Sequence, residues 1–135
     1  MSDFKRLRVW GKAHSLTLNA HRLASSMRGA QNAALRSQIV RAAMSVPANI
    51  VEGREQSSER DFVRFLRYAL ASTSELEYHL IVAKDIRAID EADFRATLSQ
   101  VVDVRKMLHG LLRKLSQPKS LSTNLSLGPK REAEN

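Results

Sequence analysis

Residues 38–53 read QIVRAAMSVPANIVEG and carry two stripes of side chains at helical spacing. The apolar stripe begins just before this segment and consists of Leu35, Ile39, Ala42, Ala43, Val46 and Ile50. A polar stripe borders it, at spacings of 3, 4, 4 and 3, and consists of Gln38, Arg41, Ser45, Asn49 and Glu52. Residues three and four apart share one face of an α-helix. The segment therefore predicts a helix over about residues 32–52, with one face buried in a core.

Pro47 and Gly53 are the two residues of this segment that disfavour a helix. Proline removes one backbone donor from a helix interior and bends or breaks it. We expect a kink at Pro47 rather than a break, because the apolar spacing continues on both sides. Glycine is common directly after the last helical turn, so Gly53 is expected to end the helix.

Three further amphipathic segments surround this one, over about residues 7–27, 58–84 and 90–115. Ser58 and Asp90 are expected to cap the third and fourth helices, since Ser and Asp side chains accept bonds from the first turn. Four helices of roughly 20 residues with short connections predict an all-α, antiparallel four-helix bundle in residues 1–115. Residues 116–135 are polar and have no period, which predicts a disordered tail.

The composition is basic, with 22 Lys+Arg against 14 Asp+Glu and a formal net charge of +8 in 135 residues. The chain has no cysteine, which excludes disulfides, thiolate metal sites and a cysteine nucleophile. It has no apolar run near ~18 residues and no apolar signal segment after Met1. We expect a cytoplasmic protein with no membrane partner.

The excess of positive charge lies in the first third of the sequence. Residues 1–41 contain eight Lys or Arg and one acid, Asp3. Such asymmetry is typical of a surface that faces a polyanion, although a solvated basic face remains an alternative. The candidate nucleic-acid contacts are Lys5, Arg6, Arg8, Lys12 and Arg36. A further row, Arg60, Arg64 and Arg67, can follow phosphates, but the neighbouring acids favour a solvated face.

The polar stripe of residues 38–52 is expected to form a structural network with Ser72 and Glu75 of the third helix. A pair of Arg41 with Glu75 is one example of such a bond, because arginine binds carboxylates through two parallel hydrogen bonds. An enzymatic use of Arg41, Asn49, Glu75 and His79 is the less favoured alternative. If Arg41 is instead exposed, it belongs to the basic surface.

The fourth helix has an apolar arc wider than one core requires. Val102 lies on one flank of its apolar stripe, and Val104 and Leu111 lie on the other. We expect these three residues to contact another subunit, with ordinary exposed aliphatic side chains as the alternative.

The sequence contains none of the motifs below, which are typical of metal-binding or catalytic sites. There is no Glu-x-x-His pair of the kind that binds di-iron centres in bundles, no Gly-x-Ser-x-Gly elbow and no glycine-rich phosphate loop. Glu75 and His79 could share a helix face, but one such pair is a weak signal. We expect no enzymatic activity, no metal and no cofactor.

Residues 38–53 resemble the signature of a bacterial family, the four-helix-bundle proteins encoded within intervening sequences of 23S ribosomal RNA genes and their free-standing relatives. Phe4 with residues 7–13, and residues 62–76, resemble the opening and the third helix of that family. The similarity extends from about Phe4 to Leu115, so it includes all but the tail.

The resemblance implies an up-down four-helix bundle that assembles into a ring-shaped homopentamer. It implies no enzymatic activity, and RNA or DNA binding is the usual proposal for the family. Related accessory proteins of diversity-generating retroelements are pentameric bundles that bind nucleic acid and a reverse transcriptase. The sequence thus favours a homo-oligomeric, non-enzymatic bundle that binds RNA through a basic face. The alternative is a protein-interaction scaffold or an accessory subunit of a nucleoprotein complex.

Overall fold

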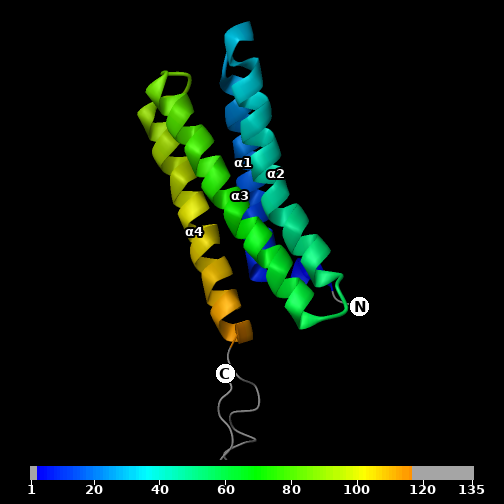
Figure 1. Cartoon of the computed structure of the whole chain (residues 1–135). Helices are drawn as coiled ribbons and strands as arrows, with labels where there is room; N and C mark the ends of the chain where they lie inside the picture. Colours follow the sequence, from blue (N-terminus) through cyan, green and yellow to red (C-terminus); the bar gives the residue numbers. More distant parts are fainter. Residues whose placement is uncertain (1–2, 117–135) are drawn as a thin grey trace, which may run out of the picture.

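The computed structural model describes residues 3–116, which form four α-helices and two short 3-10 turns (Figure 1). The helices are α1 (Arg8–Ser26), α2 (Ala33–Arg54), α3 (Glu59–Asp85) and α4 (Glu91–Ser116). The turns are η1 (Phe4–Arg6) and η2 (Ala30–Asn32). Residues 3–116 contain no strand, so the predicted all-α class is confirmed. Apart from Ser116, which ends α4, the predicted tail lies outside the described residues.

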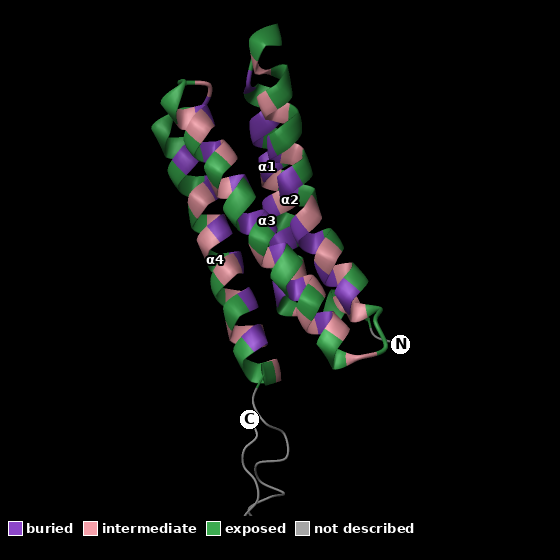
Figure 2. Ribbon diagram, in the orientation of Figure 1, coloured by how far each residue is buried: buried purple, intermediate pink, exposed green. Residues whose placement is uncertain are grey.

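The four helices pack side by side around one apolar core. Each helix contacts the next along the chain, and α1 also contacts α4. All four helices contribute buried residues to this core, and Figure 2 marks the buried positions along each helix in purple. The largest of them with almost no exposed surface include Leu16, Ile39, Leu66, Leu76 and Leu108. This arrangement is that of a helical bundle. None of the helices in residues 3–116 combines the length and apolar character needed to cross a bilayer.

Two helix starts follow the sequence prediction. The Ser58 hydroxyl accepts a hydrogen bond from the Asp61 N–H at 3.1 Å, and α3 begins at the next residue. The Asp90 carboxylate accepts from the Asp93 N–H at 2.7 Å, directly before α4. Both side chains satisfy a backbone donor that has no partner within the helix, so the predicted caps are confirmed.

The predicted role of Gly53 is wrong. Helix α2 continues through Gly53 to Arg54, and Gly53 is buried. A Cβ at this position would lie 2.8 Å from Cβ of Phe65 and 3.0 Å from Cδ1 of Phe62. The glycine therefore lets α2 and α3 approach closely. Sequence reasoning treated it as a helix terminator because the contact with α3 is not visible along one helix.

Helix α2 also continues through Pro47 without a break, as predicted. In an α-helix the missing N–H of residue 47 would bond to the carbonyl of Ala43. The Thr17 hydroxyl of α1 lies 3.0 Å from this carbonyl oxygen and 2.9 Å from that of Ala13. A neighbouring helix thus offers a donor to the carbonyl that the proline leaves without one.

Candidate nucleic-acid interface

The five basic residues predicted to contact nucleic acid do not lie together. Lys5 and Arg6 are in η1, Arg8 and Lys12 are in the first turns of α1, and all four are exposed. Arg36 lies near the start of α2, past the other end of α1. The 19 residues of α1 rise about 28 Å at 1.5 Å per residue, which separates Arg36 from the rest.

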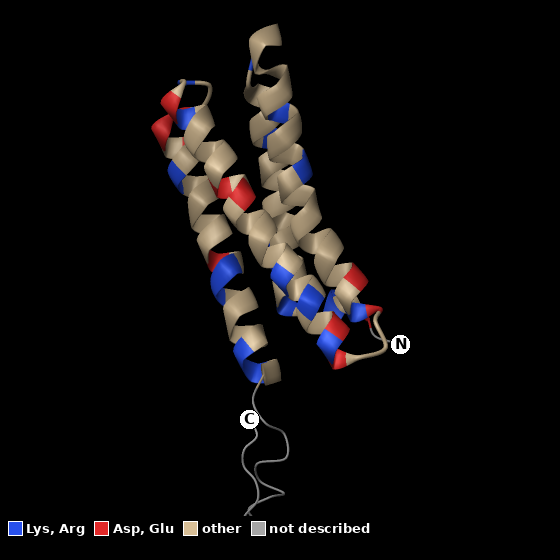
Figure 3. Cartoon of the chain, viewed as in Figure 1, with Lys and Arg blue, Asp and Glu red and all other residues tan. Residues whose placement is uncertain are grey.

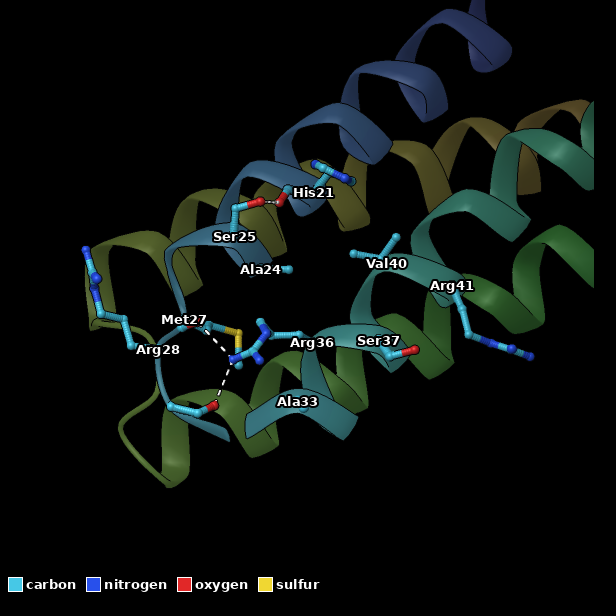
Figure 4. A pocket seen from close by; sticks show the side chains of 11 residues that line it. His21, Ala24, Ser25, Met27, Arg28, Ala33, Arg36, Ser37, Val40 and Arg41 are labelled. Atoms are coloured by element: carbon cyan, nitrogen blue, oxygen red, sulfur yellow. Dashed lines mark hydrogen bonds between the residues drawn. The ribbon is translucent and has the colours of Figure 1, made fainter. Parts of the chain in front are cut away.

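Arg36 instead holds the connection between α1 and α2. Its guanidinium donates hydrogen bonds to the carbonyls of Met27 and Gly29, both at 3.0 Å (Figure 4). It lines an open groove of about 820 Å³, in which Arg28 and Arg41 point away from each other. Arg36 therefore stabilises the carbonyl-rich end of α1. The sequence could not reveal this, because the bonds run to backbone atoms of another helix.

Three basic residues that sequence reasoning missed lie at the same end of the molecule as Lys5 to Lys12. They are Lys106, Arg113 and Lys114 of α4, and all three are exposed. Figure 1 places the start of α1 and the end of α4 at this end. We call residues 3–12 and 106–116 together the basic end. The two helices are joined by Asn19, whose Nδ2 donates to Gln100 Oε1 at 2.7 Å.

The basic end holds most of the excess charge of the described chain. It contains seven Lys or Arg and one acid, Asp3, and the Asp3 carboxylate accepts from the Lys5 N–H at 3.0 Å. Residues 13–105 contain twelve bases against eleven acids, close to balance. Many basic residues lie in the lower half of Figure 3, while acids lie both at the top, where α3 meets α4, and at the lower right, where α2 meets α3. The excess of positive charge therefore lies toward the end of the bundle where α1 begins and α4 ends.

A second basic surface lies along the first turns of α3. Arg60, Arg64, Arg67 and Tyr68 line a groove of about 690 Å³ together with Asp61. The Arg64 guanidinium donates to the Tyr68 hydroxyl and to the Asp61 carboxylate, both at 3.3 Å. These two hydrogen bonds, the one to Tyr68 first, raise the pKa of Arg64 above its usual value. The sequence indicated the arginine row but not the tyrosine beside it.

The predicted polar network is smaller than expected. The Ser45 hydroxyl donates to the Ser72 hydroxyl across α2 and α3, while Asn49 Nδ2 bonds within α2, to the Ser45 carbonyl at 2.8 Å. Arg41 is exposed and does not pair with Glu75. The Glu75 carboxylate lies 3.5 Å from His79 on its own helix.

Gln38 and Glu52, the outer members of the predicted network, are exposed. An ion pair between helices joins Arg105 of α4 to Glu77 of α3 at 2.6 Å. The polar stripe of residues 38–52 gave no signal for this pair, because both of its members lie on other helices. No group of three or more potential metal-ligating side chains occurs in residues 3–116.

The prediction that Val104 contacts another subunit is wrong. Val104 is 1% exposed in the isolated chain and belongs to the core. Val102 and Leu111 are half-buried, and Leu111 packs against the core. Other apolar side chains are more exposed, among them Leu18 of α1 and Met44 of α2, each 52% exposed. They adjoin the Thr17–Ala43 contact between these helices.

Comparison with known proteins identifies relatives of the fold and of the sequence. The family model described as 23S rRNA-intervening sequence protein matches residues 5–110. A crystal structure of a protein of unknown function from the S23 ribosomal protein family of Bacteroides thetaiotaomicron is 24% identical. It superposes with a TM-score of 0.73 over 78% of this chain and 98% of the other. The likeness to this structure supports the helical fold alone. No curated protein matches the chain.

Proposed function

The chain belongs to the 23S rRNA-intervening sequence protein family, and we propose that it is a non-enzymatic, cytoplasmic protein that binds RNA at the basic end. The observation that carries this proposal is the seven bases and single acid in residues 3–12 and 106–116. The sequence favoured RNA as the polyanion, and the structure adds three bases of α4 to the four from the start of the chain.

Binding of this kind works through the phosphates. Each lysine or arginine that neutralises a phosphate releases a counterion, so affinity falls as salt is added. Such contacts hold the strand without reading its sequence. The exposed side chains Lys5, Arg6, Arg8, Lys12, Lys106, Arg113 and Lys114 are the proposed contacts.

We also propose that the bundle has the up-down order of helices and assembles with itself into a ring, a homopentamer by its resemblance to the family. The short connections and the contacts of α1 with both α2 and α4 support the up-down order. The exposed Leu18 and Met44 on one side, and the half-buried Val102 on another, support contacts between copies. A ring repeats the basic end once per subunit, and repeated weak contacts give high avidity.

Titration of a labelled RNA with the purified protein at about 50 and about 200 mM salt tests RNA binding. Six to ten phosphate contacts imply a loss of about a thousandfold or more in affinity between these salt concentrations. Undetectable binding, or affinity that does not change with salt, would contradict the proposal. Light scattering on the same sample measures the mass, and a monomer would contradict the ring.

A further inference from the structure

The groove on α3 combines three arginines with an exposed tyrosine, whereas a basic patch offers positive charge alone. We propose that it is a subsite for a single-stranded polynucleotide, with Arg60 and Arg67 binding phosphates and Tyr68 stacking on a base. This inference rests on the proposed function and names the form of nucleic acid that α3 accepts. The residues that line this groove belong to the start of α3, and none of them belongs to residues 3–12 or 106–116.

Arg64 is held in place before any ligand arrives. Its guanidinium lies 4.8 Å from the centre of the Phe65 ring and 5.8 Å from that of Tyr68. The bonds to the Tyr68 hydroxyl and the Asp61 carboxylate fix its plane. An ordered side chain loses less conformational entropy when a ligand binds. Arg64 therefore lies at the centre of the groove, between the Tyr68 hydroxyl and the Asp61 carboxylate.

Arg60 and Arg67 flank this centre and are available to a ligand. Both are exposed, and neither side chain forms a hydrogen bond or ion pair within residues 3–116. The single carboxylate that lines the groove, Asp61, accepts the bond from Arg64. Three guanidinium groups against one engaged carboxylate leave the groove positive, which matches a phosphate backbone.

Tyr68 adds an exposed aromatic ring to the charged side chains of the groove. Its side chain is 46% exposed, and the Phe65 ring meets it edge-on at an interplanar angle of 83° and a centroid distance of 5.5 Å. An exposed ring of fixed orientation can stack on a base of any sequence. Bases in a duplex are already stacked on each other and are not free to do so. The groove should therefore prefer a single strand over a duplex.

Binding of Tyr68→Leu to single-stranded oligo(rU), oligo(dT) and an RNA duplex of equal length tests the stacking. We expect a loss of roughly tenfold on both single strands, the effect of removing one stacked base, and little change on the duplex. Tyr78→Leu is the matched control, because Tyr78 is another tyrosine of α3, is 63% exposed and lies outside the groove. Fluorescence of a 2-aminopurine strand should be quenched by the wild type and less by Tyr68→Leu.

The double variant Arg60→Gln/Arg67→Gln tests the phosphate contacts. The slope of log affinity against log salt on oligo(rU) should fall by about 0.7 for each arginine. If Tyr68→Leu and Tyr78→Leu bind alike, or if Tyr68→Leu weakens duplex and single strand equally, the subsite is refuted while the proposed function stands. If polyglutamate displaces the strand and Tyr68→Leu binds it unchanged, the groove is a general anion surface. If the wild type binds no RNA at all, the proposed function falls first.

Discussion

The two ends of α1 use positive charge in opposite ways. At its start, Lys5, Arg6, Arg8 and Lys12 are exposed, and this end of α1 lies toward the same end of the bundle as the end of α4. Past its other end, Arg36 is bound to two backbone carbonyls. The two sets look equivalent along the sequence, because all five residues belong to the same charge excess. The comparison teaches that a basic residue is available to a polyanion only if no backbone or side-chain acceptor already holds it.

The close packing of α2 on α3 depends on Gly53. Of the substitutions considered, replacing Gly53 is expected to change the free energy of unfolding most. Gly53→Val should lower the free energy of unfolding by about 3 kcal/mol, because the added side chain collides with Phe65 and Phe62. Gly11→Ala is the control at an exposed helical glycine with nothing within 4 Å. It should raise stability by about 0.5–1 kcal/mol, since alanine favours the helix. Urea denaturation measures both. Equal effects of the two substitutions would contradict the close approach of α2 and α3.

Replacing Arg36 is expected to lower the free energy of unfolding by less than replacing Gly53 does. Arg36→Met should lower the free energy of unfolding by about 1–2 kcal/mol, because the carbonyls of Met27 and Gly29 lose a charged donor. Arg28→Met removes the same charge from the exposed neighbour in the same groove and should change stability by less than about 0.5 kcal/mol. Thermal denaturation separates the two variants. If Arg36→Met were as stable as Arg28→Met and bound RNA far more weakly, the result would contradict the structural role and assign Arg36 to the RNA-binding surface.

The sequence was sufficient to predict the helices because their apolar spacing is local information. The caps at Ser58 and Asp90 were predictable for the same reason. The role of Gly53 and the burial of Val104 were not, because both depend on which helix lies opposite. Val104 sits at the edge of its stripe on a helical projection, and only the packing of α4 against its neighbours assigns it to the core.

The candidate site was predictable in part. Four of its seven basic residues were found from the charge of the first third, but Lys106, Arg113 and Lys114 were not. They lie about a hundred residues along the chain from Lys5. An antiparallel bundle, which the sequence predicted, places the start of the first helix and the end of the fourth toward the same end, so combining charge with topology was the missing step. The Arg36 bonds had no such signal, since they run to backbone oxygens.

A matched pair of charge variants tests the central claim most directly. One variant replaces Arg6, Arg8 and Lys12 by glutamine. The other replaces Arg28, Arg41 and Arg87, whose side chains are exposed, form no hydrogen bond or ion pair within residues 3–116 and lie outside the basic end. Both remove three positive charges. The measurement is the salt dependence of RNA binding.

The first variant should lose affinity and lower the salt slope by about 0.7–0.9 for each phosphate contact removed. The second should bind nearly as the wild type does, because exposed charges beyond about 10 Å are screened. Equal loss in the two variants would contradict a binding surface at the basic end.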